Sequence, residues 1–389
     1  MTKLPRHSGS RLFAGCLTAW LLGVMLLTAP PPARAQSGAM AIGTAGSYAL
    51  SRAFMVLEDP GAALTLDEVL QPAQQARFQP VAQSGSATNF GLTGSAFWLR
   101  IELQPGPDAP AQWLLEVAYP ALDRIELYAP LSGGGFSRQH GGDLQPFASR
   151  PVPHRNHVLP VTLQAGQPQT LYLRVQSQGT LSAPVNLWQA PALWAHDQAE
   201  YAMLSLYFGL LIGLLLYNLL LYGSVHDRAY LIYVGFVAGM AVAQAALTGL
   251  GAQFLWPDQL WWNSVSPPVG MSVAAAFGLL FARNFLAAAT RMPRMNRLML
   301  ALVGGWLLAL LAALALPYAV SSWMVTVLAV VSVTTVVLAG VLSVRDKHPG
   351  ARYFLTAWAV LLLGVATLVL HNTGVLPSNL LTANALLIG

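Results

Sequence analysis

Six long apolar runs in the second half of the chain constrain its fold more than any other feature. A run of about 20 residues can cross a hydrocarbon layer of about 30 Å as a helix. Only 9% of the 389 residues are charged, whereas a soluble domain usually carries about 25% charged residues. The sequence therefore predicts six complete transmembrane helices, at residues 201–221, 230–250, 269–285, 298–316, 323–344 and 353–371.

The segments that connect these apolar runs alternate in charge. The connections after the first, third and fifth runs, counted together with Arg283 at the end of the third run, hold eight lysine and arginine residues, whereas the connections after the second, fourth and sixth runs hold none. Basic loops stay on the cytoplasmic side of a membrane. The first run should therefore enter the membrane from outside, so that the N-terminal half of the chain lies outside as well.

Residues 1–35 have the pattern of a secretory signal peptide. Three basic side chains precede an apolar stretch, and an Ala-x-Ala cleavage signal ends at Ala35. An uncleaved anchor helix is the alternative interpretation. The single cysteine, Cys16, lies in this segment, so the mature chain is expected to contain no disulfide and no cysteine-ligated metal.

The segment 47–190 alternates apolar and polar side chains with a period of two. In "AFWLRIELQ", aliphatic side chains and Phe97 fall on one face, with Trp98, Arg100 and Glu102 on the other. The stretches "DRIELYAP" and "QTLYLRVQS" show the same alternation. This pattern is typical of half-buried antiparallel strands, and several such strands at short spacing predict a β-sandwich.

The end of the chain holds the start of a further apolar run. This run begins near residue 380, and ten residues of it are present. Ten helical residues cover about 15 Å, which is half of a bilayer. We therefore expect a seventh helix that is incomplete in this chain.

Stretches in both halves of the chain resemble one known family. The first half contains "NFGLTGSAFWLRIEL", "WLLEVAYPALDRIELY" and "LYLRVQSQGTLSAPVNLW", and the second half contains "YFGLLIGLLLYNLLLYGSVHDRAYLIYVGF", "FARNFL" and "LPSNLLTANALLIG". Each stretch is a weak signal, but their order is specific. The chain resembles the bacterial seven-transmembrane receptors with diverse intracellular signalling modules, over nearly all of its mature length.

The resemblance implies a two-part membrane protein in a bacterial inner membrane. An all-β, jelly-roll-like sandwich of the family's second periplasmic type, similar to carbohydrate-binding modules, should precede an all-α polytopic bundle. In the family, the seventh helix continues into a cytoplasmic diguanylate cyclase, histidine kinase or phosphatase, and such outputs usually work as homodimers. The expected order is a signal peptide at 1–35, a linker at 36–46, a periplasmic sensor at 47–190, a linker at 191–200, and a seven-helix domain at 201–389 that is incomplete at its C-terminus.

The expected function is sensing of a small molecule by the sandwich and relay of that state through the helices. A transporter or envelope-assembly protein with a periplasmic docking module is the alternative. The chain carries no Gly-x-Ser-x-Gly, phosphate-loop or His-Glu-x-x-His motif, so we predict no catalytic residue and no cofactor in it. Nucleic acid is not expected as a partner, because residues 36–200 hold 12 acidic and 8 basic side chains without a basic patch.

Five side chains on the non-aliphatic face of the predicted strands are candidates for ligand binding. Aromatic rings stack on sugars, and a guanidinium donates paired hydrogen bonds to hydroxyl or carboxylate groups, so a carbohydrate or a carboxylate would suit them. The alternative is that the arginines pair with Glu102, Glu116 or Glu126 and brace the sheet. The five candidates are Trp98, Arg100, Tyr128, Tyr172 and Arg174.

Other polar side chains give weaker signals. His154 and His157 in "PHRNH" lack a third metal ligand nearby, so no metal site is predicted. Polar residues in or beside the apolar runs could line a buried pocket, although hydrogen bonds between helices are the simpler interpretation. Two Gly-x-x-x-Gly pairs, at 209/213 and 235/239, are typical of close helix packing. The polar residues of the runs are Asn218, Gln244, His371 and Asn372.

Overall fold

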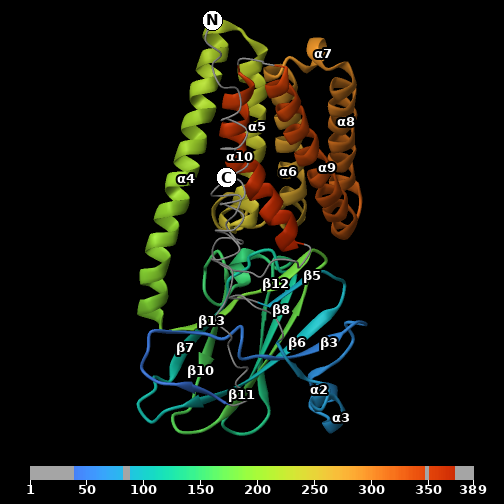
Figure 1. Cartoon of the computed structure of the whole chain (residues 1–389). Coiled ribbons are helices and arrows are strands. Elements are labelled where there is room, and N and C mark those ends of the chain that lie inside the picture. The colour runs from blue at the N-terminus through green and yellow to red at the C-terminus, as the bar shows by residue number, and fades with distance from the viewer. Residues whose placement is uncertain (1–38, 82–87, 347–349, 373–389) are drawn as a thin grey trace, which may run out of the picture. The chain divides into compact units, whose positions relative to one another are not determined.

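The computed structural model describes residues 39–81, 88–346 and 350–372. It contains a β-sandwich followed by a helical region (Figure 1), which confirms the predicted two-part fold. The predicted signal peptide and the start of the predicted seventh helix lie outside the described residues. The expectation of a jelly-roll topology stays a prediction.

The larger sheet has seven strands and supplies the face on which the candidate residues lie. Its central strands β6 and β11 pair antiparallel over eight residue positions, from Gln169↔Leu103 to Gln176↔Ala96. In order across the sheet, the strands are β4 (Gln79–Pro80), β3 (Met55–Asp59), β6 (Ala96–Pro105), β11 (Gln169–Gln176), β8 (Arg124–Pro130) and β9 (Phe136–Gly141), with β1 (Met40–Ile42) paired parallel to the end of β6.

Strand β1 lies inside the segment that the sequence predicts to be a linker, 36–46. Met40 pairs with Leu103 and Ile42 pairs with Pro105, so the sandwich begins earlier than position 47. The alternation pattern could not indicate this strand, because three residues are too few to show a period.

The smaller sheet covers the aliphatic face of the larger one. It consists of β10 (His157–Thr162), β7 (Gln112–Val117), β13 (Val185–Trp188) and β2 (Ser47–Ala49), and a separate pair joins β12 (Thr180–Ala183) to β5 (Thr88–Leu92). The predicted inward residues of β6 and β11 are buried, with Leu99 and Leu103 at 0% exposure. These side chains belong to one apolar core with residues of the smaller sheet, such as Leu115 and Leu187.

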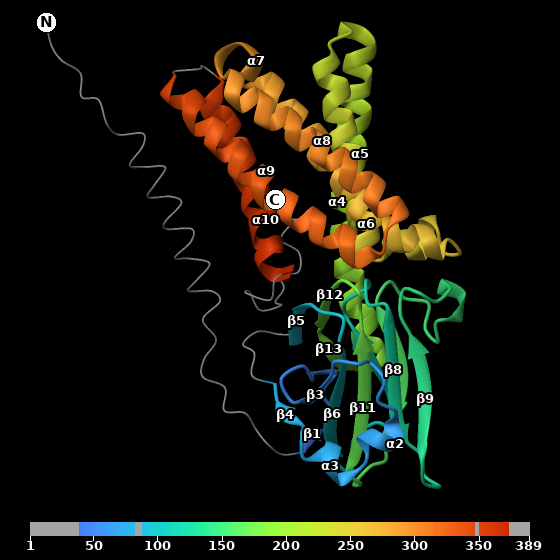
Figure 2. The same cartoon turned by 90° about the vertical axis from the view of Figure 1, so that its right-hand side faces the viewer.

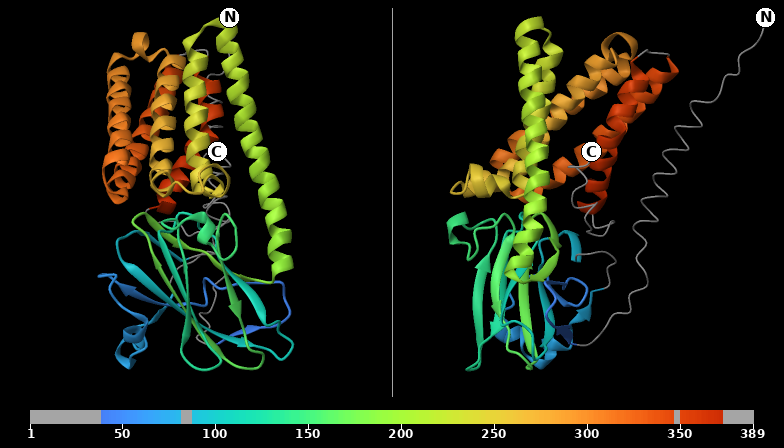
Figure 3. Two further views of the ribbon diagram at one scale, coloured as in Figure 1. Left: turned by 180° about the vertical axis from the view of Figure 1, so that it is seen from behind. Right: turned by 90° about the vertical axis from the view of Figure 1, so that its left-hand side faces the viewer.

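Helix α4 (Ala190–Val225) follows the last strand directly and has 36 residues. Pro191 stands in its first turn, where its fixed backbone angle suits a helix start. The predicted linker 191–200 is therefore part of a continuous helix that also contains the first apolar run (Figure 3). A helix of this kind joins the sandwich to the membrane without an intervening loop.

The remaining helices follow the predicted apolar runs. Five described helices are long and apolar enough to cross a membrane, namely α4, α5, α6, α8 and α9. The sixth predicted run, 353–371, lies in α10, which is not among those five. The helical elements after α4 are α5 (Arg228–Leu247), η2 (Gly251–Leu255), α6 (Leu260–Phe285), α7 (Ala288–Arg291), α8 (Pro293–Ala315), α9 (Tyr318–Arg345) and α10 (Ala351–Asn372).

Glycines bring α5 and α6 into close contact. A Cβ added at Gly239 would lie 2.5 Å from the backbone nitrogen of Ala274, and one at Gly270 would lie 2.5 Å from that of Ala243. The predicted packing role is therefore confirmed for the pair at 235/239. For the pair at 209/213 on α4, no neighbouring atom of the described residues lies within 4 Å of either added Cβ.

One acidic side chain lies where the sandwich meets the helices. Asn263 of α6 donates to the backbone carbonyl of Asp143 at 3.3 Å. One oxygen of the Asp143 carboxyl is shielded from solvent and lacks a protein partner among the described residues. Burial raises the pKa of Asp143 to about 7, the carboxylate of Asp123 acts in the same direction, and Arg150 opposes both.

We expect Gly239→Ala to destabilise the helical region, because the new methyl group would meet backbone atoms of α6 that cannot rotate away. Overpacking of this kind costs about 1–3 kcal/mol. Thermal unfolding of the purified chain in detergent should show a lower midpoint. Gly209→Ala is the matched control, and its midpoint should stay the same or rise slightly, since alanine favours helix over glycine. Equal midpoints for the two variants would contradict the packing.

The raised pKa of Asp143 predicts that stability falls as pH rises. The folded chain keeps a proton on this carboxyl between pH 4 and pH 7, where the unfolded chain has released it, and one pKa unit corresponds to about 1.4 kcal/mol. Unfolding midpoints measured from pH 5 to pH 8 should decrease, and Asp143→Asn should reduce that decrease. Asp108→Asn, at an exposed turn, should leave the slope as in the wild type. An unchanged slope in Asp143→Asn would refute the assignment.

Candidate ligand site

The five predicted site residues lie on one face of the larger sheet, in two adjacent rows. Register places Arg174 of β11 between Trp98 of β6 and Glu126 of β8. The next row places Tyr172 of β11 between Arg100 of β6 and Tyr128 of β8. Because alternate residues of neighbouring strands share a face, the pairing brings residues from distant parts of the sequence together.

A short helical segment covers part of this face. It contains α2 (Leu66–Val69) and α3 (Pro72–Gln75), beside β3 in Figures 1 and 2. Thr65 starts α2 with a capping box, in which its hydroxyl accepts from the Glu68 N–H and the Glu68 carboxylate accepts from the Thr65 N–H at 2.8 Å. The helix start is thus fixed by local sequence.

Trp98 lies beneath this segment and has 0% exposure. Its ring stacks on that of Tyr128, with centroids 5.6 Å apart. It forms a second apolar cluster with Leu57, Val69 and Phe78 on the side of the sheet opposite the main core. Trp98 therefore supports Tyr128 from behind and has no surface to offer a ligand.

Arg100 and Tyr172 hold the covering segment in place. Arg100 Nη1 donates to Gln75 Oε1 at 2.5 Å, and the Tyr172 hydroxyl donates to the same oxygen at 3.4 Å. The Arg100 guanidinium also lies 5.0 Å from the centre of the Phe78 ring. These two predicted site residues brace α3, although the partner is Gln75 and not a glutamate.

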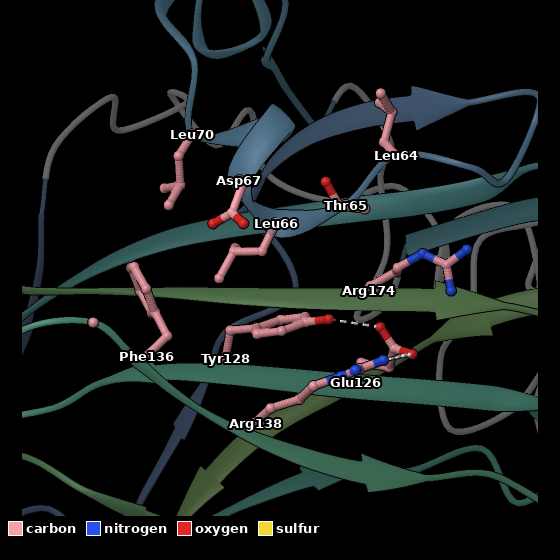
Figure 4. A pocket seen from close by; sticks show the side chains of 11 residues that line it. Leu64, Thr65, Leu66, Asp67, Leu70, Glu126, Tyr128, Phe136, Arg138 and Arg174 are labelled. Carbon is pink, nitrogen blue, oxygen red and sulfur yellow. Dashed lines mark hydrogen bonds and ion pairs between the residues drawn. The ribbon is translucent and has the colours of Figure 1, made fainter.

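The other two predicted residues, Tyr128 and Arg174, line an open pocket of about 820 Å³ beside α2. Leu66 and Asp67 from α2 face Tyr128 and Phe136 across it (Figure 4). Arg174 Nη2 donates to the Ala62 carbonyl at 2.9 Å, which holds the loop before α2. The full lining is Leu64, Thr65, Leu66, Asp67, Leu70, Glu126, Tyr128, Gly135, Phe136, Arg138 and Arg174.

Glu126 is the centre of the polar groups in this pocket. Its carboxylate accepts from Arg138 Nη2 and from the Tyr128 hydroxyl, both at 2.8 Å. Burial alone would raise the pKa of Glu126, but the hydrogen bonds from Arg138 and Tyr128 outweigh it and hold that pKa below its ordinary value. Burial and the bond to Glu126 raise the pKa of Tyr128 to about 12. The pocket therefore presents two carboxyl groups, from Asp67 and Glu126, together with a phenol hydroxyl and two guanidinium groups.

Sequence reasoning missed Arg138, Phe136 and Asp67. The turn "LSGGG" after β8 is a recognisable hairpin signal. Pairing β8 with β9 across that turn gives the register Tyr128↔Arg138 and would have found Arg138. The position of Asp67 follows from how the covering segment folds onto the sheet, which no local pattern indicates.

The other candidates of the sequence lie away from this pocket. His154 Nε2 lies 3.0 Å from Asp197 Oδ2, and His157 Nε2 lies 3.0 Å from the Pro120 carbonyl. Across the described ranges, no three His, Cys, Asp or Glu side chains gather in a way that could hold a metal. Burial lowers the pKa of His157 to about 3, and the charge of Arg150 adds to this.

The polar residues of the apolar runs have different surroundings. Asn218 donates to the carbonyl of Leu214 in its own helix at 2.8 Å and is half-buried on α4. Gln244 is 2% exposed in α5, and its side-chain nitrogen has no protein partner among the described residues. His371 and Asn372 end α10, and their side chains lie outside what the structure describes.

We expect Gln75→Ala to loosen the covering segment, because it removes the acceptor shared by Arg100 and Tyr172. The loss of a hydrogen bond to a charged group costs about 1.5–3 kcal/mol. Amide hydrogen exchange in residues 64–78 should become faster, while exchange in β6 and β11 stays slow. Gln71→Ala in the same segment is the control, since Gln71 makes no side-chain cap bond. Unchanged exchange in Gln75→Ala would show that the segment is held by other contacts.

Comparison with known proteins gives two matches to family models and no match among curated proteins. Residues 51–189 match the model described as 7TMR-DISM extracellular 2. Residues 200–389 match the model described as 7TM diverse intracellular signalling. The protein is accordingly a multi-pass membrane protein with an extracellular sensor domain. Because the two models follow each other in order and together cover most of the chain, the protein belongs to the seven-transmembrane receptors with diverse intracellular signalling modules.

Proposed function

We propose that this receptor senses a carbohydrate in the pocket beside Tyr128 and relays binding through its membrane helices to a cytoplasmic output. The observation that carries the proposal is the pocket itself, which combines aromatic side chains with hydrogen-bonding groups of both charges. Tyr128 and Phe136 supply the rings, and Glu126, Arg138 and Arg174 supply donors and acceptors. Sugars are bound by this combination of flat apolar surface and directed hydrogen bonds.

The charge balance of the pocket favours an uncharged ligand over a carboxylate. Asp67 and Glu126 each carry a negative charge, and Arg138 and Arg174 each carry a positive one. An anion would gain from the two guanidinium groups but would be repelled by the two carboxylates. A neutral polyol can donate to the carboxylates and accept from the guanidinium groups, so it satisfies both.

The distribution of basic residues supports a periplasmic position for the sandwich in a bacterial inner membrane. Arg228 begins α5, Arg283 lies in the last turn of α6, and Arg345 ends α9. Basic residues at these helix ends favour the cytoplasmic side. The sandwich precedes α4, whose other end leads into that side, and is therefore assigned to the opposite face of the membrane.

Arg138→Ala should weaken sugar binding about tenfold or more, because it removes a charge-assisted donor and leaves Glu126 with one fewer partner. Binding is measured by screening the purified full chain, in nanodiscs, against immobilised sugars and then by calorimetry with the best sugar. Arg138 is the variant of choice because its side chain is 50% exposed, so the fold should tolerate the change. Arg124→Ala, at an exposed position outside the pocket, is the matched control.

Two results would contradict the proposal. Equal sugar affinity in Arg138→Ala and the wild type would place the binding site elsewhere on the chain. Binding of simple carboxylates in the absence of any sugar binding would show that the ligand class is wrong while the receptor assignment stands.

A further inference from the structure

Four consecutive polar side chains immediately before and at the start of β10 are buried where the sandwich contacts the helices. We call residues 154–157 the junction segment. Their exposed fractions are 2% for His154, 8% for Arg155, 2% for Asn156 and 2% for His157. Buried polar groups are costly unless they find partners, so the contacts of this segment indicate what it is fixed to.

Arg155 contacts two different helices with one guanidinium group. Its Nη2 pairs with the carboxylate of Glu200 on α4, and its Nη1 donates to the carbonyl of Thr248 at the end of α5 at 3.3 Å. The group also lies 5.9 Å from the ring centre of Tyr201. A rigid fork of donors suits a residue that must hold two acceptors at once.

His154 adds a second contact with α4. Its Nδ1 accepts from the backbone N–H of Asn156 at 3.1 Å, which leaves the ring proton on Nε2 to be donated to Asp197 at 3.0 Å. Asp197 and Glu200 are three residues apart and therefore share one face of α4. Both acidic side chains of this face are thus engaged by neighbouring residues of the junction segment.

The same segment is bound to the smaller sheet on its other side. Asn156 Nδ2 donates to Glu116 Oε1 of β7 at 2.7 Å. Glu116 Oε2 accepts from Trp188 Nε1 of β13 at 2.8 Å. Arg150 Nη1 donates to the carbonyl of His154 at 2.7 Å. The junction segment is therefore attached by side chains to β7, through Glu116 to β13, and to two helices.

The backbone of the junction segment also lies close to the backbone at the end of α5. Gly249 follows the end of α5 with φ of 77°, and a Cβ at this position would lie 2.6 Å from the carbonyl oxygen of Arg155. Helix α4 is joined to β13 through the chain, but α5 follows α4 at the helix end far from the sandwich. A shift of the sandwich can reach the end of α5 directly only through non-covalent contacts such as these.

We propose that Arg155 is the positioning residue that couples the sandwich to α4 and α5, so that a displacement of the smaller sheet moves both helices together. A signal requires contacts whose arrangement differs between two states. Bonds from one buried guanidinium to two helices make both helices follow a displacement of the sandwich, because breaking either bond would leave a buried polar group without its partner. The inference rests on the receptor family and not on the sugar pocket, so the two proposals can fail separately.

Spin-label distance measurements on the full chain in nanodiscs test the coupling. In a Cys16→Ser background, one label at Leu131 of the sandwich and one at Phe254 beyond α5 form the cross pair; these side chains are 53% and 64% exposed. Labels at Asp108 and Leu131 form a pair within the sandwich. Arg155→Gln should at least double the width of the cross-pair distance distribution and leave the sandwich pair unchanged. Arg77→Gln, an exposed arginine bonded to Gln74, should change neither.

Glu200→Gln provides a second variant in case Arg155→Gln folds poorly. It weakens the pairing with α4 but leaves the bond from Arg155 to Thr248, so it should broaden the cross-pair distribution less than Arg155→Gln does. An unchanged cross-pair width in either variant would overturn the proposal. Equal broadening of the cross pair and the sandwich pair would also overturn it, because Arg155 would then merely stabilise the sandwich.

Discussion

The burial of one aliphatic face of the larger sheet determines where the other features of the sandwich lie. Leu99, Leu103 and Leu173 can leave water only against the smaller sheet, and their burial fixes the strand register. Because side chains alternate between faces, the same register places Trp98, Tyr128 and Arg174 on the opposite face. The candidate ligand site is therefore a consequence of core packing and not an independent feature.

The opposite face holds residues that pack under the covering segment and, next to them, residues that line the open pocket. Trp98 and Tyr172 are buried in the apolar cluster under the covering segment, and Arg100 bonds to Gln75 of that segment. Tyr128 and Arg174 remain at the edge of that segment, where an open pocket begins. The interpretation as braces therefore applies to Arg100 and Tyr172, which bond to Gln75, and to Arg174, which bonds to Ala62. A role of Tyr128 and Arg174 in ligand binding stays a prediction.

The junction segment has a different physical basis from the rest of the sandwich. Most of the sandwich interior is apolar, whereas residues 154–157 bury charged and polar groups, of which His154 and Arg155 contact α4 and α5. Apolar contacts tolerate sliding, but a buried guanidinium with two acceptors has few alternative positions. Such a contact restricts the relative positions of the sandwich and the helices more than an apolar contact would.

The sequence by itself determined the two-part fold, the order of the membrane helices and the face on which five candidate residues lie. These properties follow from the period of the apolar residues, the length of the apolar runs and the charge of the segments between them. Tertiary structure alone decided that Trp98 is covered and that "PHRNH" contacts two helices. The helix partners of "PHRNH" are 43 to 93 residues away in the sequence, and Trp98 is covered by a segment folded back over the sheet. No local pattern specifies such contacts, because they depend on how packed elements meet.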